Sequence, residues 1–148
     1  MPHYAENRKA RFNYEFLEKY ETGIELLGTE VKSVRGGQMS LEGAFIIIRG
    51  GEAFLINANI PPYQPRNAPK DYDPLRNRKL LLTKKEIGEL AGSEKNKSLT
   101  IVPISVYNKG RKIKVEIALV KGKKKFDKRE TLKKRDTDRE IRREIKEH

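Results

Sequence analysis

The chain has 148 residues, which is enough for one compact domain with an appended segment and too few for two ordinary domains. Its 33 Lys and Arg outnumber its 21 Asp and Glu, and the resulting formal net charge of +12 indicates a polyanionic partner. There is no cysteine, and both histidines, His3 and His148, lie near the ends; this composition excludes disulfides and thiol chemistry and argues against a histidine-based zinc site or catalytic triad.

The first predicted strand covers residues 12–20, where Phe12, Tyr14, Phe16 and Tyr20 fall on alternate positions. Gly23 interrupts this pattern, and residues 24–28 are expected to form a second short strand in a hairpin with the first. Residues 29–35 end at a glycine pair, and this pattern is typical either of a helical turn or of a continued strand.

The clearest local signal is a hairpin in which residues 44–49 and 52–57 flank Gly50 and Gly51. Two glycines readily supply the positive φ angles of a two-residue turn, so these runs are predicted to pair. Residues 61–74 follow with five prolines and no periodicity, which predicts a long loop that either has a function or covers one end of a barrel.

A short helix is predicted after Thr83, because Glu86 three residues later completes a capping box and a weak apolar stripe ends at Gly92. Strands are then expected over residues 99–107 and 111–120. In the second of these strands one face is apolar and the other carries lysines. Pro103 lacks a backbone donor, which indicates an edge position or a bulge.

Six strands joined mostly by hairpins, with one or two short helices, predict a mainly β protein built as a small antiparallel barrel or sandwich. The longest apolar run, residues 44–48, is far shorter than the ~20 residues that a membrane span needs. The first eight residues contain no apolar leader. We therefore expect a cytoplasmic protein without a membrane partner.

The composition changes after Val120. Residues 121–148 hold thirteen Lys or Arg and seven Asp or Glu, and so carry half of the net charge of the whole chain. Few apolar residues accompany them, which predicts a basic tail that does not pack against the body, residues 1–120. Clustered cations bind phosphates, and the single aromatic among them, Phe126, could stack on a base; the alternative is a solvated tail with no specific target.

Three groups of cations on the body could converge on one RNA-facing surface, or could be scattered charge that only confers solubility. They are Arg8, Lys9 and Arg11 before the first strand, Lys32 and Arg35 beside a glycine pair, and Arg76, Arg78 and Lys79 before three leucines.

A nuclease-like magnesium site is a further hypothesis, because Asp71 and Asp73 are close together in the long loop and could combine with Glu42 or Glu52. An Asp-x-Asp pair in a proline-rich loop is a weak signal, and turn capping explains both residues more simply.

An ordered series of motifs resembles the SmpB family, the SsrA-binding proteins of bacteria. The similarity runs from about residue 7 to residue 140, and its specificity comes from the series rather than from any single motif. The matching segments are residues 7–11 (NRKAR), 20–24 (YETGI), 28–35 (GTEVKSVR), 51–55 (GEAFL), 58–60 (ANI), 78–82 (RKLLL), 121–125 (KGKKK) and 127–129 (DKR).

The resemblance implies a six-stranded antiparallel barrel of the oligonucleotide-binding (OB) type with one to three short helices. It also implies an adaptor without enzymatic activity or cofactor, which binds the tRNA-like domain of transfer-messenger RNA (tmRNA) and delivers it to stalled ribosomes for trans-translation. Elongation factor Tu would be an indirect partner through tmRNA, and we expect the protein to be a monomer. The alternative within the same fold class is a ribosomal protein or translation factor that binds another RNA.

Carried over by position, the resemblance assigns RNA contacts to Glu21, Leu81 and Lys114, with Asn7 and Arg11 as plausible neighbours. Lys114 could pair with a phosphate, Glu21 could accept hydrogen bonds from base amino groups or a 2′-hydroxyl, and an exposed Leu81 could pack on an unstacked base. Leu81 could equally be a core residue, since it is one of three consecutive leucines. The expected RNA-binding face is completed by Lys32, Arg35, Arg78 and Lys79.

The tail resembles the family segment that is disordered in the free protein, becomes helical on the ribosome, and enters the decoding site and message channel of the small subunit. Phe126 stands where the family commonly has histidine, so stacking is retained but an imidazole hydrogen bond or charge is not. The tail positions expected at the ribosome are Gly122, Lys123, Lys124, Lys125, Phe126, Asp127, Lys128 and Arg129.

Overall fold

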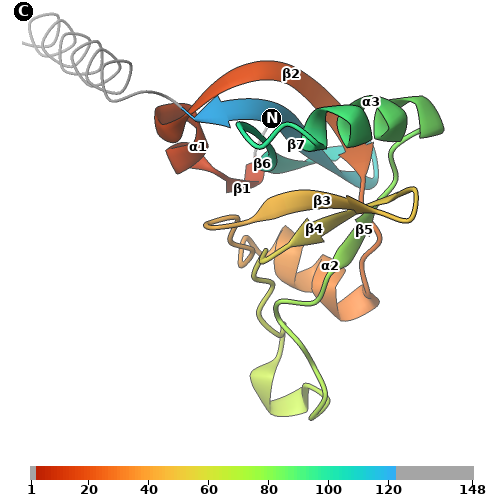
Figure 1. The fold of residues 1–148 in the computed structure, drawn as a ribbon. Helices are drawn as coiled ribbons and strands as arrows, with labels where there is room; N and C mark the ends of the chain where they lie inside the picture. Colours follow the sequence, from red (N-terminus) through yellow and green to blue (C-terminus); the bar gives the residue numbers. More distant parts are fainter. Residues whose placement is uncertain (1–2, 123–148) are drawn as a thin grey trace, which may run out of the picture.

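The computed structural model describes residues 3–122, which form seven strands and three α-helices (Figure 1). Residues 3–122 also contain one short 3-10 helix, η1 (Pro65–Asn67). In chain order the elements are β1 (His3–Glu6), α1 (Arg8–Asn13), β2 (Tyr14–Gly23), α2 (Gly28–Arg35), β3 (Phe45–Arg49), β4 (Glu52–Ile56), β5 (Arg78–Leu80), α3 (Lys84–Glu94), β6 (Leu99–Lys109) and β7 (Lys112–Gly122).

The strands form two antiparallel sheets. The larger sheet has the order β1-β6-β7-β2, and the smaller has the order β3-β4-β5. β3 packs against β6 and α3 contacts both of these strands, so the main core lies where the two sheets meet. Its fully buried side chains include Leu55, Ile101 and Ile117. Among residues 3–122, no helix is both long and apolar enough to cross a membrane.

Several local predictions are confirmed. Gly50 and Gly51 adopt φ angles of 58° and 74° at the turn of the β3–β4 hairpin. Thr83 and Glu86 form both hydrogen bonds of the capping box at the start of α3, although the helix continues past Gly92 to Glu94. The register between β6 and β7 shifts next to Pro103, which is the expected bulge.

Two predictions at the start of the chain are wrong in detail. The strand expected from residue 12 begins at Tyr14, because Asn7 caps a short helix over Arg8–Asn13 with its side-chain oxygen, 3.2 Å from the Ala10 nitrogen. Residues 24–28 do not form a hairpin strand. β2 pairs with β7 instead, Ile24 makes only an isolated bridge to Leu80, and the segment after Gly28 is the helical alternative, α2.

The strand count and the barrel also differ from expectation. The structure has seven strands in two sheets, and a closed barrel is not formed by residues 3–122. β1 and β5 were not predicted, since each has only three or four residues and is defined by its pairing with distant strands, β6 and β4. At the other end, β7 continues to Gly122, two residues past the expected body–tail boundary.

The buried carboxylate of Glu30 connects α2 to β5 and to the long loop. Arg78 is 0% exposed and binds Glu30 Oε2 through Nε and Nη2 at 2.8 and 2.6 Å. Arg76 reaches Glu30 Oε1 at 2.5 Å, and Arg78 also donates to the carbonyl oxygens of Ala58 and Pro74. Buried charges are tolerated only when they are paired and hydrogen-bonded in this way.

Replacing Glu30 by alanine is expected to lower the free energy of unfolding by about 3–5 kcal/mol, because the guanidinium of Arg78 would be left buried without its partner. Urea unfolding followed by circular dichroism measures this loss. The matched control is Glu42→Ala, which removes an exposed pair with Lys9 and should cost under about 1 kcal/mol. Equal losses in the two variants would contradict the role of burial.

Stability should also fall in acid. Burial raises the pKa of Glu30, but hydrogen bonds from Arg76, the Leu27 backbone and Arg78 outweigh it and hold this pKa below the ordinary value of 4.5. A lowered folded-state pKa means that the stabilisation is complete above the unfolded-state value and is lost as the pH drops through the folded-state value. Unfolding midpoints should therefore decrease below about pH 4.5, and less steeply in Glu30→Gln.

Candidate nucleic-acid interface

A groove of about 320 Å³ lies between α2, the end of β2, the residue after β5 and the start of β7. It is lined by the side chains or backbone of Gly23, Ile24, Leu26, Val31, Arg35, Leu81, Arg111, Lys112, Ile113 and Lys114. Its lining combines apolar side chains with four cations, and no carboxylate lines it. A phosphate backbone with an exposed base is complementary to such a surface.

Leu81 projects into this groove and is 53% exposed, so the interpretation of this leucine as a core residue is wrong. The alternation of an extended segment explains the difference, because Leu80 is 1% exposed and its neighbour must face the other way. The Leu81 backbone nitrogen donates to the Gly23 carbonyl oxygen at 2.9 Å. A Cβ at position 23 would approach Leu81 Cδ1 to 3.1 Å, so glycine leaves room for the leucine there.

Lys114 supplies the groove with a cation that is not neutralised locally. It lies opposite Gly23 on β2 and Tyr107 on β6, with its side chain half-buried. Among residues 3–122 its ammonium makes no hydrogen bond or ion pair, while Arg35 donates to the Arg111 carbonyl oxygen at 3.1 Å. Lys114 is therefore available for a phosphate.

Glu21 lies beside the groove as a fixed acceptor. Its carboxylate receives hydrogen bonds from the Tyr107 hydroxyl and from Lys109 Nζ, the latter at 2.9 Å. These bonds, with a smaller contribution from the charge of Lys114, hold the pKa of Glu21 below its ordinary value. Burial and the hydrogen bond to Glu21 raise the pKa of Tyr107. Glu21 thus stays ionised and can accept further hydrogen bonds at neutral pH.

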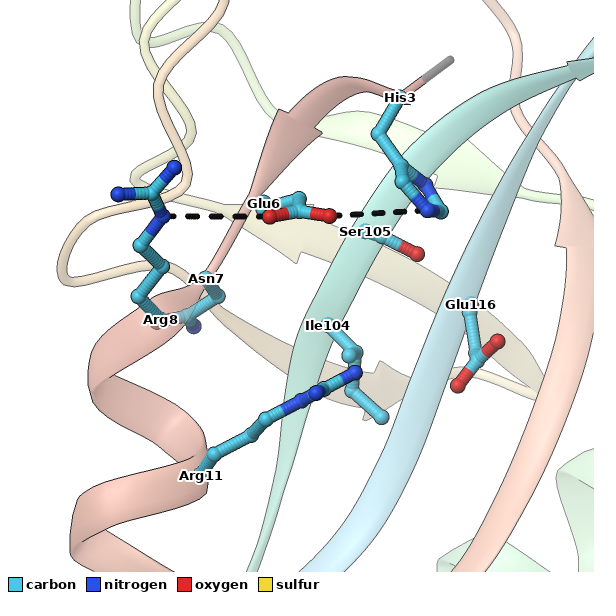
Figure 2. A pocket seen from close by; sticks show the side chains of 8 residues that line it. All are labelled: His3, Glu6, Asn7, Arg8, Arg11, Ile104, Ser105 and Glu116. Atoms are coloured by element: carbon cyan, nitrogen blue, oxygen red, sulfur yellow. Dashed lines mark ion pairs between the residues drawn. The ribbon is translucent and has the colours of Figure 1, made fainter. Parts of the chain in front are cut away.

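Asn7 and Arg11 lie outside this groove, at a separate hollow of about 310 Å³ that also contains His3, Glu6 and Glu116 (Figure 2). The Asn7 side chain is occupied structurally, because it caps α1 and donates to the Pro103 carbonyl oxygen at 3.0 Å. Figure 2 shows Arg11 extending across β6 near Ile104, away from the Glu6–Arg8 ion pair. The five best-matched RNA positions are therefore divided between two sites.

Arg78 requires a correction, because it was expected on the RNA-binding face and is completely buried against Glu30. Its guanidinium is hydrogen-bonded inside the molecule and cannot reach a phosphate. Lys79 is half-exposed and pairs with Glu52 at 3.1 Å, while Lys32 is exposed and lies 5.9 Å from the centre of the Tyr63 ring. The cations of the body therefore do not form one RNA-facing surface, and they do not all serve solubility either, because Arg78 is a buried structural residue.

The carboxylates of the magnesium hypothesis are engaged separately. Asp73 caps a turn by accepting from the Leu75 nitrogen at 2.9 Å, Glu42 pairs with Lys9, and Glu52 pairs with Lys79. Across the described range 3–122, no three His, Asp or Glu side chains are grouped so that they could hold a metal ion. Turn capping therefore accounts for Asp73.

The tail predictions fall mostly outside the described residues. Gly122 is the exposed last residue of β7 and pairs with Tyr14, and positions 123–129 lie beyond the described range. Sequence reasoning missed two residues of this region: Ile113, which lines the groove and begins the apolar alternation of β7, and Tyr107, which lies outside the groove lining and donates its hydroxyl hydrogen bond to Glu21.

Comparison with known proteins provides the family context for this geometry. The family model described as "SmpB protein" matches residues 4–147. Proteins named SsrA-binding protein from Gloeothece citriformis and Mesoplasma florum are 52% and 54% identical over 142 residues, covering 96% of this chain and 92% and 95% of their own lengths.

A solved structure described as "tmRNA-SmpB: a journey to the center of the bacterial ribosome" is similar to this one, with a TM-score of 0.68 and 44% sequence identity. The match covers 86% of this chain and 92% of the other. Identity of this degree over nearly the full length, together with the family model, shows that the chain belongs to the SmpB family.

Proposed function

We propose that this protein binds the tRNA-like domain of tmRNA and delivers it to stalled ribosomes for trans-translation. The observation that carries the proposal is the groove in which exposed Leu81 lies among Lys114, Arg35 and other cations. Two comparisons support this RNA as the ligand. The relatives in the family are named SsrA-binding proteins, and the similar solved structure is described by tmRNA, SmpB and the bacterial ribosome.

Each residue that is expected to contact the RNA has a distinct part in this proposal. The ammonium of Lys114 pairs with a backbone phosphate, which positions the RNA without reading its sequence. Leu81 packs on the face of an unstacked base. The carboxylate of Glu21 accepts hydrogen bonds from a base amino group or a 2′-hydroxyl, which phosphate-binding cations cannot do. Arg35 adds positive charge at the α2 side of the groove.

The protein acts in this proposal as an adaptor rather than as an enzyme. The two sheets are an open form of an OB-type barrel, and the isolated bridge between Ile24 and Leu80 supports that relation because it joins the end of β2 to β5. A second RNA contact through Arg11 and Asn7, a cytoplasmic location and a monomeric state belong to the same proposal, with elongation factor Tu as an indirect partner through tmRNA.

The body and the basic tail have different tasks. Residues 1–120 bind the tRNA-like domain, and the tail, residues 121–148, enters the decoding site and message channel of the small ribosomal subunit. The tail contributes half of the net charge of the chain, which suits a path lined by ribosomal RNA. Phe126 stacks on a ribosomal base in this scheme, without a hydrogen bond from an imidazole.

Lys114→Ala should flatten the salt dependence of binding to the isolated tRNA-like domain. Loss of one phosphate contact lowers the slope of log K against log salt concentration by about 1, while Glu21→Ala should weaken binding without changing the slope. Fluorescence anisotropy at four or more salt concentrations measures both effects. Lys97→Ala, an exposed turn lysine distant in sequence from the groove segments, is the control and should leave affinity and slope unchanged.

Deletion of residues 123–148 should leave affinity for the tRNA-like domain nearly intact and abolish tagging of the nascent chain in a reconstituted translation system. The cut follows Gly122, so the pairing of β7 with Tyr14 is preserved. Anisotropy and a tagging assay on a message without a stop codon supply the two readouts. Comparable loss of RNA affinity would show that the tail and the body do not have separate tasks.

A further inference from the structure

A third hollow, of about 120 Å³, lies between α2 and the long loop that connects β4 to β5. We call it the Tyr63 pocket; the residues used below are Lys32, Tyr63, Gln64, Asn67 and Tyr72, all of which line it. The loop extends away from both sheets toward the bottom of Figure 1, so the pocket is carried on a projecting part of the molecule. Its size admits a single planar ring rather than a folded element.

The loop is anchored firmly at its base. Arg76 and Arg78 both bind the buried carboxylate of Glu30, and the Pro74 carbonyl oxygen accepts from the Ile60 nitrogen at 2.9 Å. The Tyr72 hydroxyl donates to the Ile60 carbonyl oxygen at 2.7 Å. Prolines further restrict the unfolded chain in this segment. The pocket is therefore formed before any ligand arrives, which reduces the entropy lost on binding.

The pocket combines an aromatic face, a cation and two amides. Tyr63 is 46% exposed, which is unusual for so large a ring, and Lys32 Nζ lies 5.9 Å from its centre. Asn67 Nδ2 donates to Gln64 Oε1 at 2.9 Å, so the two side chains hold each other while the other polar atom of each amide remains available. An RNA nucleotide offers the π face of its base for stacking, the edge groups of the base for the amides and a backbone phosphate for the lysine.

The Tyr63 pocket and the groove described above share no lining residue, but both are bordered by α2. Lys32 and Arg35 are one helical turn apart on α2, so their side chains are neighbours on its surface. Arg35 lines the groove with Leu81 and Lys114, whereas Lys32 lines the pocket. One RNA strand that follows these two cations would contact both sites.

We propose that the Tyr63 pocket receives an unpaired nucleotide of the same RNA that occupies the groove, with its base stacked on Tyr63 and its phosphate at Lys32. This inference rests on the proposed function, because it takes the tRNA-like domain as that RNA. A peptide is the competing occupant. Prolines and Ala68 also line the pocket, but a volume of about 120 Å³ admits only one ring, and the one charged residue of the lining is the cation Lys32, which favours an anionic backbone over a peptide.

The absence of tryptophan from the sequence allows a direct test. Tyr63→Trp keeps an aromatic face in the pocket and introduces the only indole of the protein, whose fluorescence should be quenched when the tRNA-like domain stacks on it. The matched control is Leu75→Trp, on the same loop, 48% exposed and outside the pocket lining. Quenching in the first variant without quenching in the second supports the proposal.

Affinity provides the second readout. Tyr63→Ala should weaken binding of the tRNA-like domain about 10-fold, as expected for loss of one base–aromatic stack, whereas Leu75→Ala should leave it unchanged. Lys32→Gln should lower the salt slope by about 1. Both tyrosine and leucine are exposed, so circular dichroism should show folded variants.

The outcomes separate this inference from the proposed function. If the unaltered protein binds the RNA and Lys114→Ala weakens it, but the Tyr63 variants show neither quenching nor loss of affinity, the pocket proposal alone is overturned. Quenching by purified ribosomes or by a peptide, but not by the tRNA-like domain, also overturns it. If the unaltered protein does not bind the tRNA-like domain, the proposed function and this inference both fail.

Discussion

The buried carboxylate of Glu30 is the interaction on which the rest of the structure depends. It receives three side-chain hydrogen bonds from Arg76 and Arg78, and so ties α2 to the start of β5 and to the end of the long loop. An unpaired charge at this depth would cost several kcal/mol, so the fold needs Glu30 and its two arginines together. Because Glu30 fixes the inward face of α2, it also fixes the outward positions of Lys32, which lines the Tyr63 pocket, and Arg35, which lines the groove.

The cations of this protein are not interchangeable, although the net charge of +12 counts them as equals. Arg76 and Arg78 hold the fold together, and Lys79 is neutralised in part by Glu52. Lys114 makes no ion pair within residues 3–122 and lies in a groove that is lined by apolar side chains and other cations but by no carboxylate, so it is available for an external anion. Affinity for a polyanion depends on this second kind of cation, and only its surroundings distinguish it from the first.

Local signals in the sequence predicted the elements whose causes are local. The β3–β4 hairpin follows from two glycines at positive φ, and α3 follows from the Thr83 capping box. The failures have the opposite origin. β5 is defined by its pairing with β4. Residues 24–28 do not form the expected strand, because β2 pairs with β7, about a hundred residues away. The predicted RNA-binding face failed at Arg78 for the same reason, since no residue near Arg78 in the sequence indicates that it is buried in an ion pair with Glu30.

The sequence by itself determined the mainly β class and the basic character of the chain, and it shows that half of the net charge lies in residues 121–148, because composition and period are properties of the residues in order. Its resemblance to a family also singled out Glu21, Leu81 and Lys114 as predicted RNA contacts. Only the tertiary structure decided that Leu81 faces outward, that Arg78 faces inward and that Asn7 and Arg11 lie at a separate hollow. The reason is that exposure and pairing are set by contacts between segments far apart in the chain, which no local pattern encodes.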